Sequence, residues 1–202
     1  MHWLYLPNLE VPTGSLAVGE MRDGPTEGVT VVRLPPGNYR PCIGSERVGH
    51  AAGVIAMVRV LHESVFGGWR GDRRGPEGVE WGGVVAWVTT NVAAVGFFDH
   101  ELLAGLVERD PAGFDAWSRG LFAAMQFPHG FAQFGGDARA RLLYVLSEGG
   151  GGRFPVCELL LDGRPVGLEV AFAPLLVDAV DVERDVVTER IAGHEPLVPQ
   201  HL

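Results

Sequence analysis

Glu158 and Glu169 are the two residues whose type and spacing could do chemistry. They lie on either side of Asp162-Gly163, a dipeptide that favours a two-residue hairpin turn. With that turn, the two glutamates share one face of the hairpin and lie diagonally across it, about 7 to 8 Å apart at the backbone. Two carboxylates at such a separation can act together as acid and base. The other interpretation is that both point into water, as one solvated face of an antiparallel sheet predicts.

The same turn predicts the opposite, apolar face of the hairpin. Its register places three pairs opposite one another, namely Leu161 and Arg164, Leu159 and Val166, and Cys157 and Leu168.

Asp99 is the third candidate acid. It follows the apolar stretch that ends in VGFF and precedes leucines at helical spacing, so it is equally well explained as the N-cap of a helix. With Glu158 and Glu169 it gives the hypothesis of a small hydrolase or a metal-dependent enzyme, which requires the three carboxylates to converge in a concave site.

The loop FGGWRGDRRGPEG, residues 66–78, offers a different chemistry. Trp69 could stack on a ligand, while Arg70, Arg73 and Arg74 could pair with an anion. The alternative is that these arginines are simply solvated, because most surface arginines bind no specific partner.

Established catalytic motifs are absent from the sequence. It has no GxSxG, no HExxH and no GxGxxG after a strand, and its seven histidines form no cluster at metal-ligand spacing. All 16 basic residues are arginine, which excludes a Schiff-base lysine and a phosphate loop that ends in GK[ST]. We therefore predict no metal site and no cofactor.

Charge and cysteine content indicate the kind of partner and compartment. The net charge of −9 argues against nucleic acid, whose phosphates require a basic face, and fits a protein partner with a basic surface. Cys42 and Cys157 are too few for a disulfide framework, and we expect free thiols in a reducing cytoplasm. The most apolar stretch after the N-terminal residues, GVVAWVTTNVAAVGFF, is short and contains polar residues, so no membrane span is predicted.

Strands must position most of these residues. Apolar runs at 15–18, 29–34 and 54–61 are separated by GPTEG, PPGN and IGSE, which are typical of turns. Residues 84–90 lack alternation and predict a central strand that is buried on both faces. Residues 141–147 favour a strand over a helix capped at Asp137. The glycines 149–152 have the length of a hairpin bend between this strand and the next.

Two helical patterns occupy the middle of the chain. Leucines and a valine on one face follow Asp99, and a second pattern begins at Asp110-Pro111, where an acceptor side chain precedes a proline.

Four stretches resemble, in order, an uncharacterised bacterial family of domains of unknown function. They are VPTGSLAVGEM (11–21), LPPGNYRPC (34–42), VGFFDHELL (95–103) and GGGRFPVCELLLDGRPVGLEV (150–170). The resemblance spans most of the chain and implies no established activity. Asp99 matches an acidic position of the family, Glu20 stands at a second one, and Gly151 replaces an aspartate.

We expect a single mixed α+β domain, residues 1–202, with a mainly antiparallel β-sheet. Its parts are a β-rich region (11–98), a helical insertion packed on one face (99–127), a β-hairpin region (141–173) and an acidic C-terminal tail (175–202). The expected function is that of a non-enzymatic binding or interaction protein with an acidic surface, and an immunity protein that neutralises a partner is one form of it. The enzyme and the anion-binding loop are the alternatives.

Overall fold

The computed structural model describes residues 2–20, 28–46, 54–67, 78–91, 94–124, 127–137, 139–147 and 150–172. Their strands form two antiparallel sheets. One sheet has seven strands. Six of them follow the order β1 (His2–Tyr5), β5 (Gly37–Glu46), β6 (Val54–His62), β12 (Arg164–Ala171), β11 (Gly152–Leu161), β7 (Val79–Thr90). The seventh, β2 (Leu9–Val11), also pairs with β5. The other has five, in the order β4 (Thr30–Arg33), β3 (Ser15–Glu20), β8 (Ala94–Asp99), β10 (Arg141–Leu146), β9 (His129–Gln133).

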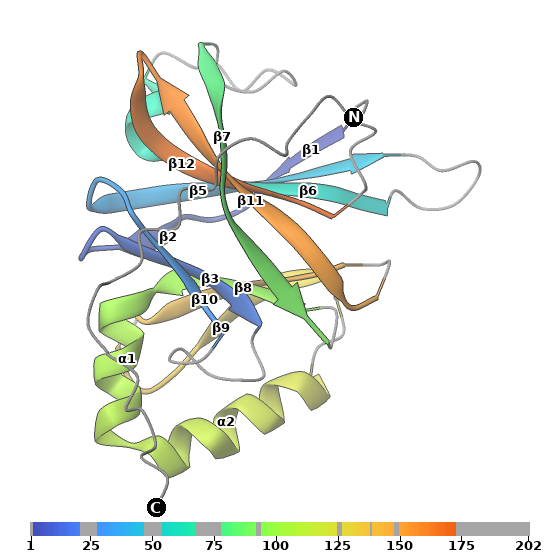
Figure 1. Cartoon of the computed structure of the whole chain (residues 1–202). Helices are drawn as coiled ribbons and strands as arrows, with labels where there is room; N and C mark the ends of the chain where they lie inside the picture. The colour runs from blue at the N-terminus through green and yellow to red at the C-terminus, as the bar shows by residue number, and fades with distance from the viewer. Residues whose placement is uncertain are drawn as a thin grey trace, which may run out of the picture.

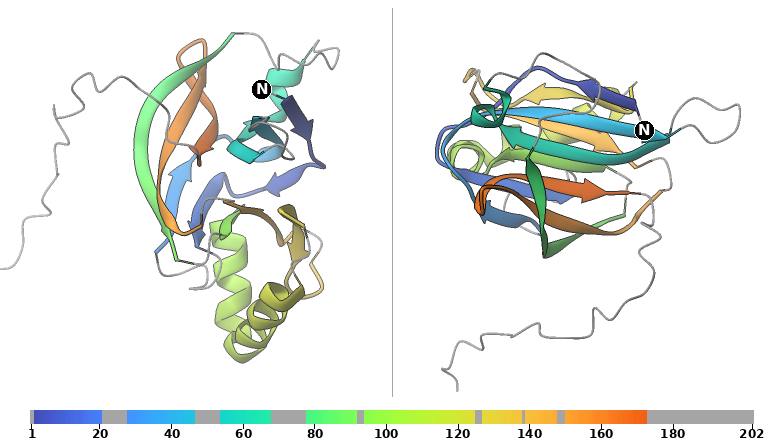
Figure 2. Two further views of the ribbon diagram at one scale, coloured as in Figure 1. Left: turned by 90° about the vertical axis from the view of Figure 1, so that its right-hand side faces the viewer. Right: turned by 90° about the horizontal axis from the view of Figure 1, so that it is seen from above.

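The main hydrophobic core lies between the two sheets (Figure 1). Val58, Val60 and Leu168 face it from the seven-stranded sheet, and Phe97 and Leu143 face it from the five-stranded sheet. All five are buried, which is the arrangement expected when two apolar sheet faces pack together. The seven-stranded sheet is strongly twisted, and the right-hand view of Figure 2 shows it from above.

Two helices cover the other face of the five-stranded sheet (Figure 1). They are α1 (His100–Arg109) and α2 (Pro111–Ala124). Leu103 and Phe114 pack there against Phe98 and Leu142 of the sheet. The molecule therefore has three layers, with the helices on one outside and the seven-stranded sheet on the other.

The predicted fold class is confirmed: the described residues form mainly antiparallel sheet, with a helical insertion packed on one face. Asp99 caps α1, and Pro111 begins α2. Residues 141–146 form a strand, and the turn at Asp162-Gly163 has positive φ at both residues, 51° and 72°. The stretch IGSE, predicted as a turn, instead lies within β5.

Two further predictions about the sheets are wrong. Residues 84–90 do form a strand, as part of β7, but β7 lies at the edge of the seven-stranded sheet and exposes much of its length, so the predicted burial on both faces is wrong. β10 and β11, the strands on either side of the glycine run, belong to different sheets, so the predicted hairpin between them does not form. The acidic C-terminal tail (175–202) lies outside the described residues.

Candidate functional site

The β11–β12 hairpin contains a bulge that decides which way its side chains face. Leu161 pairs with Arg164 as predicted, but the register shifts between Leu159 and Leu160, so that Cys157 pairs with Glu169. A shift of one residue moves a side chain to the other face of a sheet. Glu158 and Glu169 therefore face opposite sides of the hairpin, and the predicted acid pair does not form.

The shift places Glu169 in a row of side chains that crosses five strands. Tyr5 of β1 pairs with Cys42 of β5, Cys42 with Arg59 of β6, Arg59 with Glu169 of β12, and Glu169 with Cys157 of β11. Directly opposed residues share a face. This row faces away from the main core, on the outer side of the seven-stranded sheet.

A buried ion pair lies in the middle of this row. Arg59 Nε donates to Glu169 Oε2 at 2.6 Å, where Glu169 is 3% exposed and the Arg59 side chain 32% exposed. The Arg59 guanidinium also lies over the Trp3 ring, 4.9 Å from its centroid. The carboxylate is thus desolvated and depends on Arg59, whereas Arg59 keeps some contact with water.

The ion pair lies in the wall of a pocket of about 370 Å³. The lining is mostly apolar and comes from four strands, with the residues Met57, Arg59, Val79, Glu80, Trp81, Leu159 and Glu169. We call this cavity the Trp81 pocket. It combines a buried charge pair with an aromatic wall, which is the usual composition of a small binding site.

The two cysteines flank the ion pair as buried, free thiols. Burial is the main cause that raises the pKa of Cys157 to about 11, with Glu169 adding to the rise and a hydrogen bond from the Trp81 side chain opposing it. Burial likewise raises the pKa of Cys42 to about 12, against the lowering effect of Arg59 and Arg40. Thiols that stay protonated at neutral pH are poor nucleophiles, so the geometry gives no support to a cysteine-based reaction.

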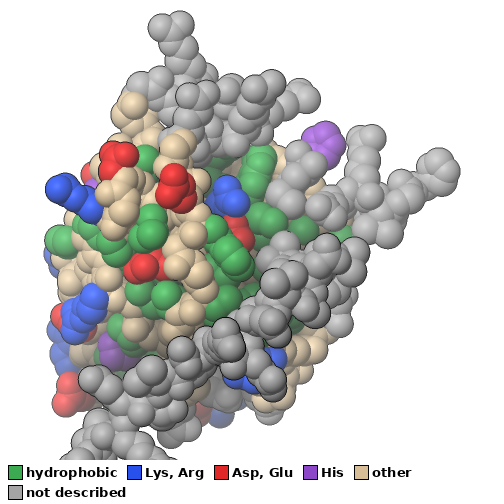
Figure 3. Space-filling view, turned by 45° about the horizontal axis from the view of Figure 1, so that its top comes forward, with side chains coloured by type: hydrophobic (Ala, Val, Ile, Leu, Met, Phe, Trp, Pro, Cys, Tyr) green, Lys and Arg blue, Asp and Glu red, His purple; other side chains and the backbone are tan. Residues whose placement is uncertain are grey.

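A strip of exposed apolar side chains continues from the pocket along β7. Trp81, Val84, Val85 and Trp87 are 50%, 41%, 47% and 47% exposed, and we call these four residues the β7 strip. Three of them, Trp81, Val84 and Trp87, pair with Leu159, Cys157 and Pro155, which alternate on the outer face of β11. Figure 3 brings this face forward and shows hydrophobic side chains spread across it between acidic and arginine side chains.

Two bulges divide the β7 strip. The register between β7 and β11 shifts at two places, so Val85 and Gly82 have no Cα partner on β11. Bulges in an edge strand commonly prevent unwanted pairing with a strand of another molecule, because they interrupt the regular row of backbone hydrogen-bonding groups. β7 therefore exposes apolar side chains, but its bulged backbone can form ladder hydrogen bonds only with a short partner strand.

Asp99 lies elsewhere and has a structural role. It is buried in the five-stranded sheet, and its carboxylate accepts hydrogen bonds from the backbone N–H groups of Thr13 at 2.8 Å and Leu102 at 2.9 Å. It thereby caps α1 and ties the turn before β3 to the helix. The three candidate acids thus occupy three separate places, and the hydrolase hypothesis loses the convergence that it requires.

The remaining sequence-based candidates belong to the loop at residues 66–78. Trp69, Arg70, Arg73 and Arg74 lie outside the described residues. Within the described parts of the chain, no group of three or more His, Cys, Asp or Glu side chains is arranged to hold a metal ion. None of the helices described here is long and apolar enough to cross a membrane.

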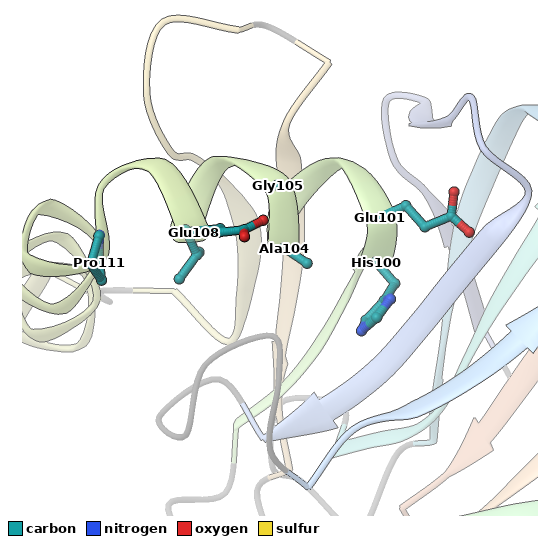
Figure 4. A pocket seen from close by; sticks show the side chains of 7 residues that line it. His100, Glu101, Ala104, Gly105, Glu108 and Pro111 are labelled. Carbon is teal, nitrogen blue, oxygen red and sulfur yellow. The ribbon is translucent and has the colours of Figure 1, made fainter.

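A larger groove of about 610 Å³, as open to solvent as the Trp81 pocket, runs along α1. Its polar residues are His100, Glu101 and Glu108, and Figure 4 shows their side chains pointing in different directions along the helix. The Glu101 carboxylate is already bound by Arg33 at 2.6 Å and by Ser15 at 2.9 Å, and these contacts lower its pKa, the hydrogen bond from Arg33 most. The groove therefore offers no set of convergent groups.

Glu20 and Gly151, the two positions singled out by the family resemblance, lie beside the same turn. Glu20 is buried and accepts from the backbone N–H of Asn91 at 2.9 Å. A Cβ atom at Gly151 would lie only 2.6 Å from the Thr90 carbonyl oxygen and 3.0 Å from that of Asn91. A side chain at position 151 would therefore collide with the backbone of Thr90 and Asn91 unless one of the two segments shifted.

Sequence reasoning missed the Trp81 pocket and the β7 strip, although both had a visible signal. The stretch VEWGGVVAWVTT lacks the alternation of a half-buried strand, and burial of a strand on both faces is one cause of such a pattern. Bulges and an exposed apolar surface remove alternation equally well. The paired glycines at 82 and 83 mark this alternative, because glycine within a strand often indicates a bulge.

Comparison of the chain with family models, with curated proteins and with solved structures gives no match. The resemblance to the uncharacterised bacterial family therefore stays a prediction.

Proposed function

We propose that this chain is a non-enzymatic interaction protein that binds a protein partner through the β7 strip. The observation that carries the proposal is the exposure of four large apolar side chains, Trp81, Val84, Val85 and Trp87, on one edge strand. Several exposed apolar side chains gathered along one strand are typical of a binding surface in a folded protein. Trp is also enriched among the residues that contribute most to protein interfaces.

Electrostatics favours a partner with a basic surface. The net charge of −9 attracts such a partner over long range and raises its rate of encounter. The contact itself is supplied by the strip, whose side chains carry no charge. We therefore expect the net negative charge to attract the partner and the aromatic side chains of the strip to form the contact.

Site-specific photo-crosslinking in the source organism tests this proposal. Val85→p-benzoylphenylalanine places the reactive group in the β7 strip, and Val31→p-benzoylphenylalanine on β4 is the matched control, because Val31 is also an exposed valine on an edge strand. We expect one discrete crosslinked protein from position 85 and none from position 31. That protein, once purified, should bind the wild-type chain and lose at least ten-fold in affinity to Trp87→Ala.

Identical crosslinking from both positions would contradict the proposal, as would a partner whose affinity does not depend on Trp87. The immunity type, in which the partner is a toxin, predicts in addition that binding abolishes an activity of the captured protein. A captured protein that keeps its activity in the complex would restrict the function to an interaction module of another kind.

A further inference from the structure

The Trp81 pocket lies at one end of the β7 strip and shares Trp81 with it. Its volume of about 370 Å³ is near the lower end of the range for ligand sites. A segment lying along β7 would pass the mouth of the pocket, which offers room for one side chain. This step rests on the proposed function, because it assigns the pocket to the same partner.

The charges in the pocket wall are already paired with each other. Arg59 and Glu169 are 2.6 Å apart, and the guanidinium is also stacked over Trp3. A cation entering the pocket would meet the Arg59 charge, and an anion would meet Glu169, in surroundings that screen charge poorly. An uncharged side chain avoids both costs and buries the apolar lining formed by Met57, Val79 and Leu159.

Trp81 provides the aromatic wall for such a side chain. It lines the pocket beside Leu159, its partner on β11. An aromatic ring offers a large contact area to an apolar side chain, so this wall adds to the burial that favours binding.

Two charged residues near the ends of the strip give it a direction. Glu80 lies at the pocket end, and Arg153 lies at the other end with its guanidinium 4.7 Å from the centroid of Trp87. Neither forms an ion pair with another described residue. Their positions along β11, where Glu80 pairs with Leu160 and Arg153 pairs with Thr89, correspond to about 23 Å of extended chain. A partner segment with a basic residue near Glu80 and an acidic residue near Arg153 complements both.

We propose that the Trp81 pocket receives one large, uncharged apolar side chain of an extended partner segment, which lies along β7 with a basic residue on the pocket side and an acidic residue toward Arg153. Only an extended segment can use the unpaired backbone of the edge strand. The bulges limit that pairing to a few residues, so the anchor side chain supplies most of the selectivity.

Selection of peptides from a random 12-residue display library against the full chain tests the inference. We expect enrichment of one large apolar residue (Leu, Met or Phe), with a basic residue on one side of it and an acidic residue on the other. The synthetic consensus peptide should bind at least ten-fold more weakly when its apolar anchor is changed to Ala or to Lys. This test on the peptide side does not depend on how protein variants fold.

Protein variants locate the anchor. Val79→Phe fills the pocket from its rim and should weaken the consensus peptide at least ten-fold, whereas the matched Val31→Phe on the other sheet should leave its affinity within two-fold of wild type. Thermal unfolding of both variants checks that the fold is kept. A charged anchor, or equal binding to Val79→Phe and wild type, would overturn the inference.

The outcomes separate this inference from the proposed function. Peptides that depend on Trp87 but show no apolar anchor overturn the pocket assignment and leave the β7 strip as an interaction surface. Selection that yields no peptide dependent on Trp87 contradicts both. Binding that appears only after residues 173–202 are removed also overturns the inference, because the chain's own C-terminal segment would then be the occupant.

Discussion

Asp99 at the end of β8 accepts a hydrogen bond at 2.8 Å from the backbone N–H of Thr13, which lies 86 residues earlier in the sequence. The same carboxylate accepts from the Thr13 hydroxyl and caps α1 through Leu102. One buried side chain thus joins the turn before β3 to the first helix. A carboxylate so fully engaged has a structural role, although its position after an apolar strand makes it a plausible catalytic acid from sequence.

Asp99→Ala should lower the free energy of unfolding by about 2–3 kcal/mol, because it removes a helix cap and leaves buried N–H groups without an acceptor. Denaturation in urea measures the change. Asp115→Ala is the matched control, since Asp115 is an exposed aspartate on α2 whose carboxylate pairs with Arg119, and its effect should stay within about 0.5 kcal/mol. Equal effects for the two variants would argue against the tethering role of Asp99.

The Arg59–Glu169 pair should respond asymmetrically to substitution. Arg59→Met leaves the Glu169 carboxylate buried without its partner and should cost about 3–5 kcal/mol. Glu169→Gln leaves an arginine that still reaches water and should cost only about 1–2 kcal/mol. Urea denaturation of both variants at pH 7 measures the difference. A larger loss for Glu169→Gln would mean that the carboxylate is better solvated than its burial indicates.

The buried Cys157 thiol predicts a loss of stability at alkaline pH. Its pKa is raised from 9.0 to about 11 in the folded protein, chiefly by burial. The folded state therefore favours the protonated thiol, and this contribution is fully present below pH 9 and lost as pH rises toward 11. Cys157→Ala should show a weaker decline in the free energy of unfolding between pH 9 and pH 11 than wild type. A decline of equal slope in both proteins would assign the effect to other groups.

Gly151→Ala should destabilise the protein by about 1–3 kcal/mol, because the new Cβ atom would force the end of β7 to shift. The control is Gly136→Ala, where an added Cβ would have no atom within 4 Å and φ is not positive, so the change should be close to neutral. Thermal unfolding of the two variants gives the comparison. Similar melting temperatures would show that the Thr90–Asn91 turn moves easily enough to accept an aspartate at position 151.

The sequence predicts the elements well where the local chemistry is strong. Asp99 and Asp110-Pro111 mark helix starts, and Asp162-Gly163 marks a turn, because each signal depends on a few adjacent residues. The bulge beside Leu159 has no such local signal, yet it turns Glu169 to the opposite face and pairs it with Arg59, which lies 110 residues away. Likewise, the apolar sequence of β7 does not show whether the strand is central or at an edge of the sheet. The position of a strand depends on the order of all strands in the sheet and not on its own residues.

The affinity of the crosslinked partner for wild-type, Trp87→Ala and Phe127→Ala chains, measured by calorimetry, tests the central claim most directly. Phe127 is the matched control, because it is a large exposed hydrophobic residue outside the β7 strip. We predict a loss of at least ten-fold, about 1.4 kcal/mol, for Trp87→Ala and a change within two-fold for Phe127→Ala. Equal affinities for all three chains, or a loss confined to Phe127→Ala, would contradict the assignment of the β7 strip as the binding surface.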